Sequence, residues 1–255
     1  MMYAIIGGTG VYKLNAPIQN LNIETEYGDV DLDFIELGNG EKVYFLSRHG
    51  KDHSKPPHNV NYRANIMALN LLGVKYIYAT AAVGSMNEKY MPGDIVLVND
   101  FIDFTKNRAT TYYGGETGVK HVDMSEPYCS NLSSVFLKRA EKSKVDIKGT
   151  AIYLTTEGPR FETKAEINMY KNFADVVGMT SVPEVVLAKE LGMCYAAIAI
   201  ITNWCTGFKS EITLHDIESS MNMNKGKLTE SFIDIFSNEN LNQNNCSCKD
   251  SIIKL

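Results

Sequence analysis

Short apolar runs alternate along the chain with segments of helical spacing. The apolar runs that predict strands are 3–6, 43–46, 74–82, 95–98, 149–154, 175–179 and 194–202. The segments that predict helices are 61–72, 132–143, 165–173, 183–191 and a last one from Thr213 toward Phe236. Strands that alternate with helices favour an α/β fold around a central, mostly parallel sheet.

No repeat or linker divides this pattern, so we expect a single domain over residues 1–236. From Ser237 the chain turns polar and rich in asparagine. We therefore expect residues 237–255 to form a loosely held polar C-terminal tail.

The segment from Thr155 to Glu166 combines a strand end, a helix start and side chains that could bind a ligand. It follows an apolar strand, is broken by Gly158-Pro159, and resumes at Thr163, which with Glu166 predicts a capping box that opens a helix. Ligands of α/β proteins bind at such strand-to-helix junctions. Phe161 and Glu162 offer an aromatic ring and a carboxylate there, although an ordinary junction would have the same pattern.

Composition narrows the class of protein. The chain has 255 residues, of which 44% are hydrophobic and 22% charged, and a formal net charge of −5. Without a basic stripe we expect neither nucleic-acid nor membrane binding, and no apolar run has the length of a bilayer span. The first apolar run is too short for a signal peptide, so we expect a cytoplasmic protein.

The five cysteines are odd in number and three of them are scattered, which argues against a disulfide framework and fits a reducing compartment. Cys246 and Cys248 are close in sequence. They could form a redox pair, but in a polar tail we expect two exposed thiols.

Several strand ends have residues suited to anions. Thr9 lies in a Gly-Gly-Thr-Gly turn after the first strand, and Arg48-His49 ends the second clear strand beside a glycine. Ala81-Ala82 are small enough for a close ligand approach, and Thr180 precedes a helix. Each also has an ordinary explanation. Thr9 could lie in a tight turn and Arg48 in a surface ion pair, while Ala81-Ala82 could pack in the core and Thr180 could cap a helix.

A protein-bound metal is not expected from the histidines. His49 and His53 have the HxxxH spacing, but the segment reads as a loop and lacks the glutamate of HExxH. At the end of the most hydrophobic strand, Asn203 offers an amide that both donates and accepts, which suits a heterocycle edge as well as a turn.

Taken together, these segments resemble the purine nucleoside phosphorylase / methylthioadenosine phosphorylase family. The matching pieces, in the family's order, are GGTG at 7–10, SRHG at 47–50, VNYRANIMAL at 60–69, AAVGS at 81–85, PGDIV at 92–96, EGPRFET at 157–163 and GMTSVPEVVLAKELG at 178–192. The resemblance implies an α/β domain whose central sheet is mixed and has the character of a distorted barrel. It also implies a homotrimer or dimer of trimers, in which a neighbouring subunit often completes the site, so that His121 or another residue of 104–125 could contribute in trans.

The resemblance also implies roles for individual residues. The positions that match phosphate binding are Thr9, Arg48, His49, Ala82 and Thr180, with Ala81 beside them. The positions that match the base and ribose pocket are Phe161, Glu162, Met179, Asn203, Trp204, Cys205 and Leu214. Among all these, Asn203, Glu162 and His49 are the candidate catalytic residues.

Two positions bear on the base. The methylthioadenosine enzymes of the family carry serine where this chain has Glu162 and aspartate where it has Asn203. A 6-oxopurine presents N1–H to a carboxylate and O6 to an amide, whereas adenine has an unprotonated N1 that would leave buried polar groups mispaired. The resemblance therefore favours a 6-oxopurine.

One position bears on the sugar. Ordinary purine nucleoside phosphorylases place a histidine at the start of the last helix for the 5′-hydroxyl. If Thr213 caps that helix, the apolar Leu214 takes this place, as in the methylthio enzymes; a shift of one residue would put His215 there instead.

The preferred activity is phosphorolysis of S-methyl-5′-thioinosine, with inorganic phosphate as co-substrate and no cofactor or metal. This would make the chain a pentosyltransferase of purine salvage. The alternatives are a general inosine/guanosine phosphorylase, then a methylthioadenosine phosphorylase. A phosphate-independent nucleosidase and a nucleoside-binding sensor without turnover also stay open.

Overall fold

The computed structural model describes residues 1–7, 18–51, 54–116, 118–143, 145–209 and 214–254, and in its last long helix it describes side chains at residue 224 and from 226 onward. The strands are β1 (Met2–Gly7), β2 (Gln19–Ile23), β3 (Val30–Glu36), β4 (Lys42–Ser47), β5 (Tyr76–Ser85), β6 (Ile95–Phe104), β7 (Lys120–Val122), β8 (Ile147–Thr156), β9 (Val176–Gly178), β10 (Cys194–Trp204) and β11 (Ile252–Lys254). The helices are α1 (Tyr62–Leu71), α2 (Ser130–Ser143), α3 (Lys164–Tyr170), α4 (Ser181–Glu190) and α5 (Leu214–Asn238), with short 3₁₀ turns at Pro57–Asn59, Gln243–Asn245 and Cys248–Asp250.

The central sheet confirms the predicted mixed α/β architecture. Within the described residues it contains nine strands in the order β10-β6-β8-β9-β5-β1-β4-β3-β2. β10 also pairs in parallel with β5, so that β5, β10, β6, β8 and β9 close into a ring. This ring is the predicted barrel character, and it brings the ends of β5, β8, β9 and β10 to one place.

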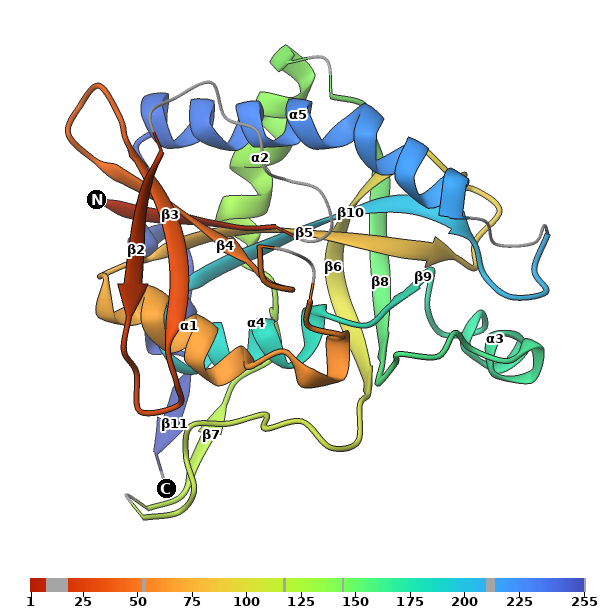
Figure 1. Ribbon diagram of the computed structural model, residues 1–255, viewed down its shortest axis with the longest axis horizontal. Helices are drawn as coiled ribbons and strands as arrows, with labels where there is room; N and C mark the ends of the chain where they lie inside the picture. Colours follow the sequence, from red (N-terminus) through yellow and green to blue (C-terminus); the bar gives the residue numbers. More distant parts are fainter. Residues whose placement is uncertain (8–17, 52–53, 117, 144, 210–213, 255) are drawn as a thin grey trace.

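Helices cover both faces of the sheet, as Figure 1 shows with α2 and α5 on one side and α1 and α4 on the other. Side chains of a strand alternate between faces, and in β1 Ala4 and Ile6 join the α1/α4 core while Tyr3 and Ile5 join the α2/α5 core. Burial on both faces explains why β10 reads as a continuous apolar run instead of an alternating one.

Local signals in the sequence place α3. The Thr163 hydroxyl accepts from the Glu166 amide, and the Glu166 carboxylate accepts from the Thr163 amide, which confirms the predicted capping box. The helix therefore starts immediately after Phe161 and Glu162 and fixes the direction in which the chain leaves them.

The polar segment between 104 and 125 is anchored to the body of the protein. Nη1 of Arg108 donates to the Val182 carbonyl at 2.8 Å, and Nη2 donates to the Glu157 carbonyl at 2.8 Å. The segment ends in β7, where His121 is exposed and is paired with Ile253 of β11.

The expectation of a loosely held tail with exposed thiols was wrong. Leu241, Cys248 and Ser251 are buried, Cys246 is half-buried, and β11 pairs antiparallel with β7 (Figure 1). The tail is polar in sequence, yet Leu241 and Cys248 join the α2/α5 core and β11 pairs with β7, while Ile253 stays exposed.

No helix of the described segments combines the length and apolar character needed to cross a bilayer.

Candidate active site

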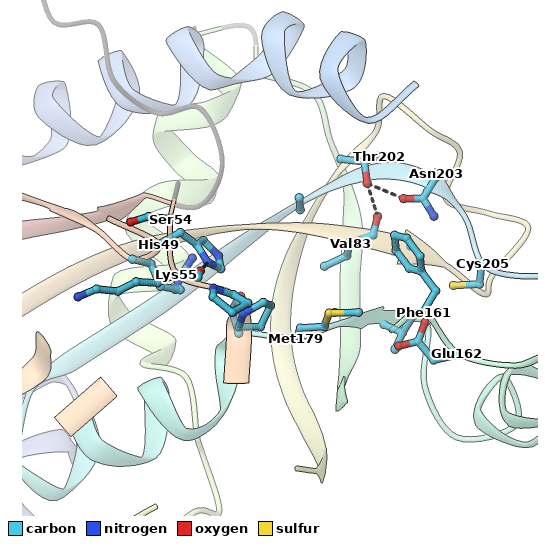
Figure 2. A pocket seen from close by; sticks show the side chains of 18 residues that line it. His49, Ser54, Lys55, Val83, Phe161, Glu162, Met179, Thr202, Asn203 and Cys205 are labelled. Carbon is cyan, nitrogen blue, oxygen red and sulfur yellow. Dashed lines mark hydrogen bonds between the residues drawn. The ribbon is translucent and has the colours of Figure 1, made fainter. Parts of the chain in front are cut away.

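A cavity of about 480 Å³ opens where the ends of β5, β9 and β10 meet the loops after β4 and β8. Its walls are formed by Arg48, His49, Ser54, Lys55, Pro56, Pro57, Ala82, Val83, Gly84, Phe161, Glu162, Val177, Gly178, Met179, Thr180, Thr202, Asn203 and Cys205. The volume is in the range of small-molecule sites. Figure 2 shows two groups of polar side chains, with His49 and Lys55 at one end, Glu162 and Asn203 at the other, and Met179 between them.

Arg48 anchors the first end. Its Nε and Nη2 donate to the Glu184 carboxylate at 2.7 and 2.6 Å, and its Nη1 donates to the Thr80 carbonyl at 2.9 Å. Both side chains of this ion pair are buried. Burial opposes the charge on Arg48, but the adjacent Glu184 carboxylate outweighs it and raises the pKa of the guanidinium.

His49 and Thr180 lie beside Arg48 on the cavity wall. Nδ1 of His49 is 2.8 Å from the Lys55 carbonyl, which fixes the ring and favours the tautomer with a proton on Nδ1. Thr180 precedes α4, but its side chain makes no capping hydrogen bond to that helix. The cap explanation for Thr180 therefore does not hold, and its side chain faces the cavity instead.

Glu162 forms the acidic wall of the second end. The side chain is buried, and its Oε1 accepts a hydrogen bond of 2.7 Å from the hydroxyl of Thr156 at the end of β8. Burial, with the Glu162 carboxylate as a further cause, raises the pKa of the Cys205 thiol. Cys205 therefore stays neutral and serves as an apolar wall.

Asn203 lies across the same end on β10. Its Oδ1 is 2.7 Å from the Thr202 hydroxyl, and its Nδ2 donates to the Trp204 carbonyl at 2.9 Å. An amide nitrogen has two hydrogens, so this arrangement orients the side chain and leaves the second donor for a ligand. Phe161, which is 52% exposed, covers this end of the cavity (Figure 2).

Met179 separates the two ends, and glycines make room around the cavity. Gly158 has φ +66°, and a Cβ there would lie 2.6 Å from Sδ of Met179. At Gly84 a Cβ would lie 2.8 Å from Sγ of Cys205 and 3.2 Å from Nδ2 of Asn203. Glycine at these two positions lets the backbone approach the site closely.

Not all of the predicted site residues lie on this cavity. Thr9 and Thr213 lie outside the described residues, as does the side chain of Leu214. Ala81 is buried in the core and Trp204 packs against Phe208, so neither side chain lines the cavity.

Sequence reasoning missed some residues that line the cavity and others that hold its lining side chains in place. The sequence pattern does not predict that Ser54 and Lys55 line a cavity or that Thr156 positions a carboxylate. Nor does it predict that Glu184 pairs with a buried cation. A signal was present for one of them, since a carboxylate in an apolar helix needs a buried cation, and Arg48 is the arginine that ends an apolar strand.

A mixed sheet closed into a ring, with helices on both faces and a polar-ended cavity at the strand ends, defines an α/β protein of the nucleoside phosphorylase fold. The same fold occurs in the crystal structure of a methylthioadenosine phosphorylase from an antarctic soil metagenomic library, with a TM-score of 0.86, 33% identity, and coverage of 98% of this chain and 90% of that one. The chain belongs to the phosphorylase superfamily, whose sequence model matches residues 2–234.

Two relatives refine the comparison. The chain is 43% identical to the probable 6-oxopurine nucleoside phosphorylase of Dictyoglomus turgidum, over 99% of this chain and 97% of the relative. It is 49% identical to the probable S-methyl-5′-thioinosine phosphorylase of Methanopyrus kandleri, over 80% of this chain and 78% of the relative.

Proposed function

We propose that this protein cleaves the N-glycosidic bond of a 6-oxopurine nucleoside by phosphorolysis, with S-methyl-5′-thioinosine as the preferred substrate. The products would be hypoxanthine and 5-methylthioribose 1-phosphate. The observation that carries the proposal is the placement of Glu162 and Asn203 together at one end of a cavity that has His49 at the other (Figure 2). Arg48, which precedes His49 in the chain, also lines this cavity.

The base end suits a 6-oxopurine. The Glu162 carboxylate accepts from N1–H, and Nδ2 of Asn203 donates to O6. N7 has no hydrogen in the nucleoside, so Oδ1 of Asn203 would accept from N7–H only after the departing base has taken up a proton there. Phe161 packs on the ring. Adenine would bring an unprotonated N1 against the carboxylate, and each mispaired buried group costs about 1–3 kcal/mol.

The opposite end suits phosphate. Arg48, His49, Thr180 and the backbone at Ala82 would hold the dianion, with Thr9 joining them, and Met179 would contact the ribose between the two ends. As the glycosidic bond loosens, the sugar gains oxocarbenium character, the phosphate stabilises it and attacks C1′, and Asn203 holds the negative charge that spreads over the departing purine. Positioning and electrostatic stabilisation suffice, and inorganic phosphate is the only co-substrate that we propose.

We further propose a homotrimer or dimer of trimers that acts in the cytoplasm. The family resemblance supports the assembly, and the five free cysteines support a reducing compartment. Light scattering coupled to gel filtration measures the assembly directly, and a monomeric mass would contradict it.

The function is tested by kcat/KM for 5′-methylthioinosine, inosine and 5′-methylthioadenosine, each with and without phosphate. We expect phosphate-dependent turnover in which methylthioinosine is preferred. Preference for inosine would place His215, not Leu214, at the 5′ position, and preference for methylthioadenosine would overturn the base assignment. Turnover without phosphate would indicate a nucleosidase, and binding without product would indicate a sensor.

We expect Thr156→Val to lower kcat/KM for 6-oxopurine substrates by roughly 10- to 100-fold, because a hydrogen bond to a charged group contributes about 1.5–3 kcal/mol. The substitution keeps the shape of the side chain and removes the hydroxyl that positions Glu162. Steady-state kinetics measure the effect.

Thr155→Val is the matched control. Thr155 is the preceding residue of β8, is fully buried, and its Oγ1 has no hydrogen-bond partner among the described residues. Loss of the Thr155 hydroxyl should leave kcat/KM unchanged. Equal losses in the two variants would show that the strand, not the Thr156 hydroxyl, determines the activity.

A further inference from the structure

Four of the five cysteines gather at the end of β10 that lies away from the active site. Cys194 is the first residue of β10, and Cys129 directly precedes α2. Cys246 directly follows the 3₁₀ turn Gln243–Asn245, and Cys248 begins the 3₁₀ turn Cys248–Asp250. Their Sγ atoms all lie within 4.8 Å of one another, and those of Cys194 and Cys246 are 3.5 Å apart. Three of the four are buried and Cys246 is half-buried.

We propose that Cys129, Cys194, Cys246 and Cys248 form a structural zinc site of the tetrathiolate type. Zinc binds thiolates at about 2.3 Å in a tetrahedron, which separates the sulfur atoms by about 3.8 Å. The observed spacings lie on both sides of this value, from 3.5 Å between Cys194 and Cys246 to at most 4.8 Å, so small shifts of the side chains would seat the ion. On binding, the four thiols release four protons and form four Zn–S bonds, and nothing is oxidised or reduced.

The surroundings favour thiolates at this place. The Leu132 amide lies 3.5 Å from Sγ of Cys129, at the first turn of α2, where unsatisfied amides and the helix dipole stabilise negative charge. Nε2 of Gln243 lies 3.7 Å from Sγ of Cys194. Such donors around sulfur are the outer shell that metal thiolates require.

The site has a structural and not a catalytic position. Cys194 and Asn203 lie at opposite ends of β10, nine residues apart along an extended strand, which corresponds to about 30 Å. Four protein ligands also close the coordination sphere and leave no position for substrate. The ion would therefore stabilise the fold without entering the reaction.

The ion would fix the C-terminal segment to the body of the protein. That segment already contacts the turn before β10, where Nε2 of Gln243 donates to the Gly192 carbonyl at 2.7 Å and Gly192, at φ +68°, lies close to the Lys249 backbone. Ser251 Oγ donates to the Lys189 carbonyl at 2.8 Å, one residue before β11 pairs with β7. Zinc joins this segment to the starts of β10 and α2 at once.

The test uses the full chain, purified under reducing conditions, with zinc measured by elemental analysis. We expect about one zinc per chain in the wild type and in Cys205→Ser, because Cys205 is distant from the cluster. Since loss of an outer-shell partner already weakens metal binding roughly 10- to 100-fold, Cys246→Ser, which removes a ligand, should lose at least as much. Cys246 is the most exposed of the four, so this variant is the one best able to fold.

Two further measurements start from the wild type, and the first of them needs no variant. Cobalt added to the metal-free reduced protein should give the charge-transfer and d–d bands of a tetrahedral cobalt thiolate, and zinc should abolish them at one equivalent. Zinc should also raise the thermal midpoint of wild type but not that of Cys246→Ser. Disulfide-linked peptides from the freshly purified protein, or a reduced protein that binds no stoichiometric zinc or cobalt, would overturn the proposal.

Discussion

Arg48→Met is expected to lower the free energy of unfolding by about 3–5 kcal/mol, because it leaves the fully buried Glu184 carboxylate without its cation. Among the described residues, Glu184 would then keep the hydrogen bond of 2.6 Å from the Tyr195 hydroxyl. Urea unfolding followed by circular dichroism measures the loss. Phosphorolysis should also fall, since Arg48 is a proposed phosphate ligand.

A second substitution separates these two effects. In Arg48→Met/Glu184→Leu both charges are replaced by apolar groups, and such replacements of buried pairs recover most or all of the stability. Stability should therefore return while activity does not. An Arg48→Met protein as stable as wild type would show that the buried pair does not hold the loop after β4 to α4.

Arg160→Met is the matched arginine control. Arg160 also makes a two-pronged contact with a carboxylate, that of Glu166, but it is 63% exposed. Exposed pairs add little to stability because water and salt screen them. Its unfolding curve should stay close to that of wild type.

Asn203→Ala is expected to lower kcat on 6-oxopurine nucleosides roughly 10²- to 10³-fold, in line with the loss of a single donor from a preorganised anion site. The reason is that Nδ2 would hold the charge that develops on the departing purine. KM should change less, because this interaction strengthens only as the bond breaks. Single-turnover and steady-state kinetics with inosine and methylthioinosine test both statements.

Asn203→Asp is a second variant that tests the donor of Asn203 by itself. It keeps the side-chain size and the acceptor that contacts Thr202 but removes the donor. The ratio of kcat/KM for 6-oxopurine over 6-aminopurine substrates should therefore fall. Near-normal turnover of inosine-type substrates by Asn203→Ala would remove Asn203 from the mechanism.

The strands and helices could be predicted from the sequence wherever a segment is buried on both faces or has a local start signal. The strands β1, β5 and β10 and the capping box at Thr163 are of this kind. The hairpin of β2 and β3 was missed, because β2 has mostly exposed, polar residues and gains its order from pairing with β3 at the edge of the sheet.

The residues of the candidate site divide in the same way, into those that the sequence predicts and those that only the folded structure reveals. Asn203 at the end of β10 and Glu162 in the junction between β8 and α3 could be found from their position in the sequence. Thr156 and Glu184 act through partners that only the folded chain brings near. The cysteine cluster was missed for the same reason, since Cys129 and Cys248 are far apart in sequence and a polar tail gives no signal of burial.

The pairing of β11 with β7 bears on the order in which a ribosome-bound chain can fold. β7 leaves the ribosome early, but its only strand partner within the described chain is Ile252–Lys254. A two-stranded ribbon is only marginally stable by itself. The ring that shapes the cavity is complete once β10 has been synthesised, so the nascent protein can acquire its pocket first and fasten the segment around β7 afterwards.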